Sequence, residues 1–153
     1  MKILITGHKG YIGLRLYRKL TNLGHDVIGI DLKDNKSIID CLPSENYDYV
    51  FHLAAFPSVQ FSVENPSYTM KNNVLSSSVL LEWCIKNKVK RLIFSSSAAA
   101  ENIESPYGLQ KRITEMECEL FSKLYGLDTV CLRYYNVYSE DQEFNGPYST
   151  VIN

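Results

Sequence analysis

Short apolar runs alternate with stretches of helical periodicity along this chain, and that alternation limits the folds available to it. The apolar runs lack the polar alternation of strands with one solvent-exposed face, so we expect strands that are buried on both faces. Buried strands separated by helices predict an α/β fold, a doubly wound parallel sheet in three layers, α/β/α. The predicted strands are 2–6, 26–31, 37–40 (short), 47–53, 91–95 and 129–133, and the predicted helices are 11–23, 66–87 and 106–125, with Gly24 and Gly126 as C-terminal caps.

One domain accounts for the whole sequence. The 153 residues contain neither an internal repeat nor a linker-like segment, so we expect a single domain over 1–153. With 45% apolar residues, 22% charged residues and a net charge of −1, the composition is that of a soluble globular protein. The sequence has no basic stripe and no long apolar segment, which argues against nucleic acid and membranes as partners.

The cysteines indicate a reducing, cytoplasmic location. Cys41, Cys84, Cys118 and Cys131 are widely spaced and form neither a Cys-x-x-Cys motif nor a cluster with histidines. Scattered cysteines of this kind are typically reduced thiols, so we expect neither disulfides nor a metal site. The N-terminal apolar run, 2–6, is too short for a secretory signal peptide and is better explained as the first strand.

A glycine-rich loop joins the first predicted strand to the first predicted helix. Gly7, Gly10 and Gly13 have the spacing that permits a tight turn, a close backbone approach to a pyrophosphate and close helix–strand packing. Tyr11 and Ile12 open the helix, where backbone N–H groups attract phosphate. The strand before the loop and the helix after it favour a Rossmann-type dinucleotide site over a plain turn, which three glycines could also form.

An acidic residue at the end of the second predicted strand extends this site. Asp31 follows Gly13 by 18 residues, at a place where a carboxylate binds the adenosine ribose hydroxyls. Leu32 next to it is expected to contact the cofactor. Because a carboxylate repels a 2′-phosphate, the sequence predicts NAD. Lys33 keeps NADP open, and a solvated turn residue is the structural alternative for Asp31.

A tyrosine and a lysine one helical turn apart could supply acid–base chemistry. Tyr107 and Lys111 lie at the start of the predicted helix 106–125 and share one of its faces. The pKa of a free tyrosine is about 10, so a nearby cation is needed to favour the phenolate near neutral pH. Ser97 follows the preceding strand, where a hydroxyl could hydrogen-bond a substrate. The structural alternatives are helix packing for the tyrosine–lysine pair and a strand-to-loop cap for the serine.

Taken together, these motifs resemble the extended short-chain dehydrogenase/reductase family, and within it the NAD-dependent sugar-nucleotide epimerases and dehydratases. The resemblance covers essentially the whole chain and rests on motifs that occur in order. The motifs are the glycine loop, Asp31, His52-Leu53-Ala54-Ala55, Asn72-Asn73-Val74, Ser95-Ser96-Ser97-Ala98, Tyr107-x-x-x-Lys111, Arg133-Tyr134-Tyr135-Asn136-Val137-Tyr138 and Asn145-Gly146-Pro147-Tyr148-Ser149-Thr150-Val151-Ile152.

The resemblance implies a role for each matching residue. Tyr107 would take the proton of the sugar 4-hydroxyl during hydride transfer to NAD, and Lys111 would bind the nicotinamide ribose and lower the tyrosine pKa. Ser97 would share the hydrogen bond to that hydroxyl, and Asn136 would also contact the sugar nucleotide. The other cofactor-contacting residues would be Asp40, Leu53, Ala54, Ala55, Asn72 and Tyr135.

Within the family, the serine-rich motif resembles the UDP-hexose and UDP-N-acetylhexosamine 4-epimerases. Ala98 and Ala99 follow Ser97, at positions where 4,6-dehydratases and many decarboxylases place an acid. We therefore expect a 4-epimerase that acts on a UDP-sugar. The alternatives are another NAD-dependent sugar-nucleotide enzyme (a dehydratase, decarboxylase or reductase) and a non-catalytic NAD-binding module.

The sequence departs from the family pattern at three places. The stretch between Asp31 and Tyr47 is too short for a full strand and helix. Only nine residues separate Ser97 from Tyr107, where the family has a longer active-site loop. The chain ends at Asn153, whereas the relatives continue into a second domain that binds the nucleotide-sugar. We therefore expect most of that domain to be missing, either because the protein is naturally short or because the chain is a fragment.

The resemblance also implies a homodimer. Family members pair through the helices that correspond to 66–87 and 106–125, which form a four-helix bundle. The alternative is that the apolar residues of these helices only cover the sheet. The residues concerned are Val74, Leu80, Leu81, Trp83, Ile113, Met116, Leu120 and Phe121.

Overall fold

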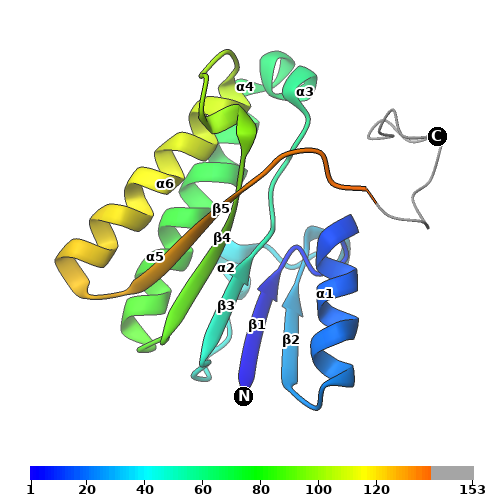
Figure 1. The fold of residues 1–153 in the computed structure, drawn as a ribbon, viewed down its shortest axis with the longest axis vertical. Coiled ribbons are helices and arrows are strands. Elements are labelled where there is room, and N and C mark those ends of the chain that lie inside the picture. Colours follow the sequence, from blue (N-terminus) through cyan, green and yellow to red (C-terminus); the bar gives the residue numbers. More distant parts are fainter. Residues whose placement is uncertain (139–153) are drawn as a thin grey trace.

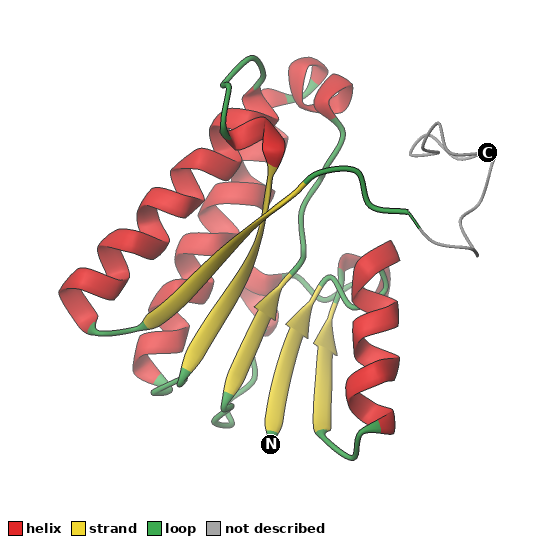
Figure 2. Ribbon diagram, in the orientation of Figure 1, coloured by secondary structure: helices red, strands yellow, loops and turns green. Residues whose placement is uncertain are grey.

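The computed structural model describes residues 1–138, which form a five-stranded parallel sheet with helices on both faces (Figures 1 and 2). The strands lie in the order β2-β1-β3-β4-β5. Because every neighbouring pair is parallel, the carboxyl ends of the strands meet at one edge of the sheet, the upper edge in Figure 1. The strands are β1 (Lys2–Thr6), β2 (Asp26–Ile30), β3 (Tyr49–His52), β4 (Arg91–Ser97) and β5 (Asp128–Tyr134).

The direction of the chain across the sheet reverses at β1. From β1 the chain passes through α1 (Tyr11–Asn22) to β2 on one side, and β3 then pairs with β1 on the other side. Such a reversal is a topological switch point, and ligands of open parallel sheets bind in the crevice at the carboxyl ends of the strands there. The topology therefore identifies the ends of β1, β2 and β3 as the place for a binding site.

Two apolar clusters hold the layers together. On one face of the sheet, Ile3, Ile5 and Val27 pack against Leu16 and Leu20 of α1. On the other face, a larger cluster joins the sheet to α5 (Ser76–Lys86) and α6 (Pro106–Tyr125). Helices therefore cover both faces, which confirms the predicted Rossmann-type, three-layer fold. The most deeply buried members of the larger cluster are Leu4, Val50, Leu80, Leu81, Cys84, Leu92, Phe94 and Cys118.

Local capping explains where the long helices begin and end. The Ser105 hydroxyl accepts a hydrogen bond from the Gly108 amide at 3.1 Å, and Pro106 occupies the first helical position of α6. Gly24 and Gly126 follow α1 and α6 with φ angles of +80° and +71°. Both glycines are thus left-handed caps, as the sequence predicts.

The segment 37–40, expected as a short strand, is helical instead. The Ser37 hydroxyl accepts a hydrogen bond from the Ile39 amide at 3.1 Å and so caps α2 (Ile38–Cys41). Ile38 is buried in the larger apolar cluster. One helical turn is enough to bring this side chain into the core. The prediction of a strand at 37–40 was therefore wrong.

The predicted helix 66–87 is interrupted by a π-helical turn. The chain forms α4 (Pro66–Met70), then the π turn (Lys71–Leu75), then α5. Before these elements lies α3 (Val59–Glu64), which the sequence analysis did not predict. Ser58, whose hydroxyl accepts a hydrogen bond from the Phe61 amide, is the capping residue that could have indicated this helix. In Figure 1, α3 and α4 lie at the edge where the strands end.

A chain of buried hydrogen bonds crosses the switch point. Thr6 Oγ1 lies 2.7 Å from His52 Nδ1, and Ser77 Oγ lies 2.8 Å from His52 Nε2. Because the Ser77 hydroxyl donates to the Asn73 carbonyl at 2.6 Å, it accepts from His52, and the ring is neutral with its proton on Nε2. Burial lowers the pKa of His52 to about 3, and the charge of Lys111 adds to the effect.

Two further findings apply to residues 1–138. No helix there has both the length and the apolar content that crossing a membrane would require. In the same residues, no group of three or more His, Cys, Asp or Glu side chains is placed to hold a metal ion. The motif 145–152 and the last part of the predicted single domain lie outside the residues that the structure describes.

We expect acid to destabilise the fold through His52. Between about pH 6.5 and pH 3 only the unfolded chain binds a proton at this ring, so the free energy of unfolding should fall by about 1.4 kcal/mol per pH unit. Urea unfolding across that range would measure the slope. The His52→Gln variant, although less stable at neutral pH, should lose this part of the slope, and equal slopes in both proteins would contradict the assignment.

Candidate functional site

The glycine loop between β1 and α1 is built by close backbone contacts. Gly7 has a φ angle of +75°, and its amide donates to the Ile30 carbonyl at 2.7 Å. A Cβ atom at Gly13 would lie 2.1 Å from the carbonyl oxygen of Gly7, so a side chain there would force α1 away from the loop. Gly10 caps α1 without a side-chain hydrogen bond. The first turn of α1 therefore has backbone amides that no capping side chain covers, and amides of this kind can bind an anion.

The carboxylate of Asp31 is fixed between two loops. Oδ2 accepts a hydrogen bond from the Lys9 amide of the glycine loop at 2.8 Å. Oδ1 accepts one from the Lys33 amide at 2.9 Å, in the 3-10 turn Leu32–Asp34 that follows β2. Each carboxylate oxygen keeps a further acceptor site, so this geometry leaves Asp31 able to bind ribose hydroxyls.

A cavity of about 420 Å³ lies at the carboxyl ends of β1, β2 and β3, which is the switch point of the sheet. It is lined by six of the predicted cofactor residues, from the glycine loop, the end of β2, the end of β3 and the π turn. These six are Gly10, Asp31, Leu32, Ala54, Ala55 and Asn72. Four other predicted residues belong to the same loops without lining the cavity, namely Gly7, Ile12, Gly13 and Leu53.

Several lining residues were not predicted as cofactor contacts. Lys33 and Lys36 bring positive charge to the end of the cavity that holds Asp31. The capping motif at Ser37, a serine before an apolar pair, was a sequence signal for a helix start at this place. The other residues in this group are Ile30, Ile38, Phe56 and Ser76.

Four predicted contact residues lie away from the cavity lining. Asp40 is exposed on α2, and Asn136 is exposed in the segment after β5. Tyr135 is 69% exposed, and its phenol donates to Glu101 Oε2 at 2.9 Å. Tyr11, at the start of α1, is 36% exposed. The cofactor or substrate contacts expected of these residues stay predictions.

The three predicted catalytic side chains come together where β4 ends and α6 begins. The hydroxyl of Ser97 lies close enough to the phenol of Tyr107 to influence its pKa. Lys111 is buried one turn further along α6, and its Nζ donates to the Ser95 carbonyl at 2.7 Å. The same Nζ lies 4.6 Å from the ring centroid of Phe94 and 5.8 Å from that of Tyr107. This arrangement groups a phenol, a hydroxyl and an amine at the carboxyl end of β4.

Burial shifts the pKa values of both Tyr107 and Lys111. It raises the pKa of Tyr107, and the Ser97 hydroxyl only partly opposes the effect. It also lowers the pKa of Lys111 to about 7. The lowering of the tyrosine pKa by Lys111 stays a prediction, and the desolvated amine is only partly charged near neutral pH. A phenolate at Tyr107 requires further positive charge nearby.

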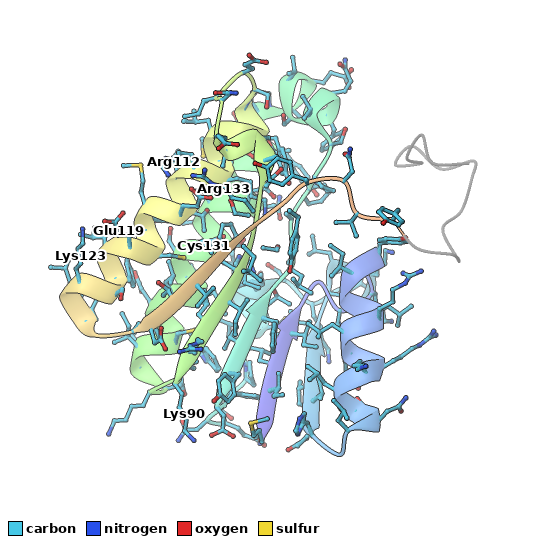
Figure 3. All side chains as sticks on the ribbon, viewed as in Figure 1. Lys90, Arg112, Glu119, Lys123, Cys131 and Arg133 are labelled. Atoms are coloured by element: carbon cyan, nitrogen blue, oxygen red, sulfur yellow. The ribbon has the colours of Figure 1, made fainter. Side chains whose placement is uncertain are left out.

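An ion cluster around the buried carboxylate of Glu115 fixes α6 against β4 and β5. Glu115 accepts hydrogen bonds from Nε and Nη2 of Arg133, both at 2.8 Å, and from the Ser96 hydroxyl at 2.6 Å. Arg112 adds a bond of 3.0 Å from the preceding turn. These bonds, those of Arg133 above all, lower the pKa of Glu115 to about 2. Figure 3 shows Arg112 and Arg133 close together where α6 faces β5, so the cluster anchors the helix that carries Tyr107.

The fold and the cavity define a Rossmann domain of the dinucleotide-binding type. The glycine loop fits such a ligand, because a Cβ atom at Gly7 would lie 2.7 Å from the Ala54 amide nitrogen and would crowd the cradle between the two loops. The sequence profile of the NAD dependent epimerase/dehydratase family matches residues 3–153. The chain belongs to this family.

Individual relatives agree with the family assignment. The chain is 32% identical over 179 residues to a putative UDP-glucose 4-epimerase of Methanocaldococcus jannaschii. This alignment covers 94% of this chain and 58% of that protein. The UDP-N-acetylglucosamine 4-epimerase of Methanobrevibacter ruminantium, solved with UDP-N-acetylmuramic acid, has a TM-score of 0.87 at 32% identity and covers 98% and 59% of the two chains. For the UDP-glucose 4-epimerase of Thermotoga maritima, solved with UDP-glucose, the TM-score is 0.83, the identity 37% and the coverage 95% and 59%.

The chain spans little more than half the length of these relatives. The alignment with the Methanocaldococcus jannaschii protein, 179 residues, is longer than this 153-residue chain, so that relative contains internal stretches with no counterpart here. The sequence analysis predicts such missing stretches between Asp31 and Tyr47 and between Ser97 and Tyr107.

We expect the Lys111→Met variant to be more stable than the wild type near pH 6, by about 2 kcal/mol in the free energy of unfolding. The pKa of Lys111 is about 7 in the folded protein, against about 10.4 for an unfolded lysine, so below pH 7 the folded state retains a buried charge. The gain should shrink as the pH rises from about 7 and largely vanish above about pH 10, where both states are neutral. Urea unfolding at both ends of this range tests it, with Lys123→Met on the exposed side of α6 as control. A Lys111→Met variant that is less stable than the wild type near pH 6 would contradict the prediction.

Proposed function

We propose that the protein is an NAD-dependent sugar-nucleotide 4-epimerase that acts on a UDP-sugar. One observation carries the proposal, namely the convergence of Ser97, Tyr107 and Lys111 at the edge of the sheet that also holds the dinucleotide-type cavity. The relatives support it, because they are named 4-epimerases and the two solved structures contain UDP-linked ligands. Ala98 and Ala99, in place of acids after Ser97, favour epimerisation over elimination.

The loops at the switch point would hold NAD. Backbone amides of the glycine loop would bind the pyrophosphate, and Asp31 would accept hydrogen bonds from the adenosine ribose. Ala54, Ala55 and Asn72 would contact the cofactor from the ends of β3 and the π turn. When bound, oxidised NAD supplies a reversible hydride acceptor and a positive charge.

Tyr107 would transfer the proton. As a phenolate it accepts the proton of the sugar 4-hydroxyl while C4 is oxidised to a ketone, and it returns the proton when C4 is reduced on the opposite face. Ser97, which lies beside the phenol, would share the hydrogen bond to the sugar oxygen. Because burial raises the pKa of Tyr107, its activation would depend on the positive charge of Lys111 and of the oxidised cofactor.

A non-catalytic NAD-binding module is the second candidate function. It is favoured by the short connection between Ser97 and Tyr107, part of which is the 3-10 turn Ala98–Ala100. A connection this short encloses less of a substrate and excludes less water from the reacting atoms. A different NAD-dependent sugar-nucleotide reaction, such as dehydration, decarboxylation or reduction, is distinguished from epimerisation by its product.

We expect the purified protein, incubated with NAD⁺ and a panel of UDP-sugars, to interconvert one pair of C4 epimers. Tyr107→Phe should lower the rate at least about 10³-fold, because the proton acceptor is removed, while the affinity for NAD⁺ stays within about threefold. Chromatographic separation of the products measures the first effect and calorimetry the second. NAD⁺ binding without any conversion would reject the epimerase and leave the binding module; conversion that survives in Tyr107→Phe would reject the assigned mechanism.

We also propose a homodimer through α5 and α6, and a cytoplasmic location. Leu80 and Leu81 are buried against the sheet, so they would not contribute to the dimer surface. That surface would consist of the exposed apolar residues of the two helices. Met116, Leu120 and Leu124 support this surface, because they are 57%, 51% and 63% exposed and recur every four residues along one face of α6. The free thiols of the four cysteines support the location in a reducing compartment.

Leu120→Glu should convert the dimer to a monomer at micromolar concentration, because the interface would then bury two unpaired carboxylates. Light scattering after size-exclusion chromatography measures the mass. Leu23→Glu, which changes a similarly exposed leucine at the end of α1, is the control and should stay dimeric. A wild-type protein that is monomeric at this concentration would refute the proposed interface.

A further inference from the structure

The π turn between α4 and α5 places two neighbouring asparagines in different surroundings. Asn72 lines the cavity at the switch point. Asn73, the next residue, is only 4% exposed and faces α6 and the loop after β3. Single π turns within helices are rare and often mark functional sites, which directs attention to what Asn73 holds.

The side-chain amide of Asn73 clamps the loop after β3. Its Oδ1 accepts a hydrogen bond from the Phe56 amide at 2.8 Å, and its Nδ2 donates to the Phe56 carbonyl at 3.2 Å. Both backbone groups of one residue are therefore held by one side chain. Phe56 and its neighbours Ala54 and Ala55 line the cavity, so Asn73 fixes the wall that would face the cofactor.

The same amide also contacts the helix that carries Tyr107 and Lys111. Asn73 Nδ2 donates to Gln110 Oε1 at 2.7 Å. Gln110 is fully buried, lies between Tyr107 and Lys111 in the sequence of α6, and donates from Nε2 to Thr69 Oγ1 at 2.9 Å. Both the oxygen and the nitrogen of the Gln110 side-chain amide are thus held by hydrogen bonds.

Backbone contacts keep Asn73 itself in place. Its carbonyl oxygen accepts the hydroxyl of Ser77 at 2.6 Å, and Ser77 is bonded in turn to the buried ring of His52 at the end of β3. The hydroxyl of Thr114, on α6, approaches the same carbonyl at 3.5 Å. Asn73 therefore connects the sheet, the cavity loop and α6 through saturated, buried hydrogen bonds, which tolerate little displacement.

We propose that Asn73 is a positioning residue that couples the cavity wall at 54–56 to the catalytic helix α6 through Gln110. Asn73 Nδ2 donates to Gln110 and to the Phe56 carbonyl at once, so a shift of the Gln110 side chain would reorient the amide that holds Phe56, although Gln110 does not itself line the cavity. NAD then binds to a wall whose position depends on α6, and Tyr107 is placed relative to that wall. The inference rests on the proposed function, since it assigns the cavity to NAD.

Gln110→Met tests the coupling, because it keeps the volume of the side chain and removes only its hydrogen bonds. We expect the dissociation constant for NAD⁺, measured by calorimetry, to rise about tenfold. In the cofactor-free protein, hydrogen exchange at the Phe56 amide, followed by NMR, should also accelerate about tenfold. Ser78→Ala is the matched control: it deletes a hydrogen bond between Ser78 and Glu117, which joins the same helices without reaching the loop, and both quantities should stay within about twofold.

Asn73→Asp provides a second variant that does not depend on the folding of the first. The ionised carboxylate can accept from the Phe56 amide but cannot donate to Gln110, whereas the protonated carboxyl can do both. The ratio of variant to wild-type NAD⁺ affinity should therefore rise as the pH is lowered from about 8 to about 5, because burial favours the protonated form. A merely structural defect would leave this ratio independent of pH.

The outcomes separate the coupling from the proposed function. Wild-type protein that binds no NAD⁺ would overturn the function, while the exchange of the Phe56 amide would still decide whether Gln110 and the loop are coupled. Wild-type binding together with unchanged affinity and exchange in Gln110→Met, or equal effects in Ser78→Ala, would overturn the role of Asn73. A flat affinity ratio in Asn73→Asp would do the same.

Discussion

The close packing of α1 against the glycine loop is the constraint on which the cofactor side of the molecule depends. A Cβ atom on Gly13 would overlap the carbonyl of Gly7, so any side chain there would displace the start of α1 from β1. The Gly7 amide donates to the Ile30 carbonyl and the Lys9 amide to the Asp31 carboxylate, and both bonds attach the same loop to the end of β2. The amides of the glycine loop and the carboxylate of Asp31 are therefore held together in one unit, whose close packing glycine alone permits.

The parts of the site that could be predicted are those with a local signal in the sequence. Strand ends of a parallel sheet meet at one edge, so Asp31 and Ala54 could be assigned to one cavity from their positions after predicted strands. Tyr107 and Lys111 share a helix face because of their spacing, and Ser97 joins them because it ends the strand before that helix. In each case a short stretch of sequence determines where the side chain points.

Other features depend on contacts that no local pattern reports. The pattern of 37–40 is short enough for a strand or a helix, and burial of Ile38 against the core decides for the helix. The partners of Asn73 are 17 and 37 residues away in sequence, so its clamp on Phe56 and Gln110 leaves no periodic trace. The raised pKa of Tyr107 also comes from burial, which residue spacing alone does not reveal.

Two buried bases lie near one aromatic ring, that of Phe94. Lys111 Nζ is 4.6 Å from the ring centroid of Phe94, and the ring of His52 is centred 5.5 Å from it. Desolvation lowers the pKa of both groups, and the charge of Lys111 lowers the pKa of His52 further, so His52 is neutral, with its ring held by Thr6 and Ser77. The charge on Lys111 is therefore costly unless an anion forms beside it, and the phenol that faces it on α6 can become that anion. Under the proposed function, ionisation of the lysine and of the tyrosine would favour each other, and the charge of the amine would assist removal of the proton from the phenol.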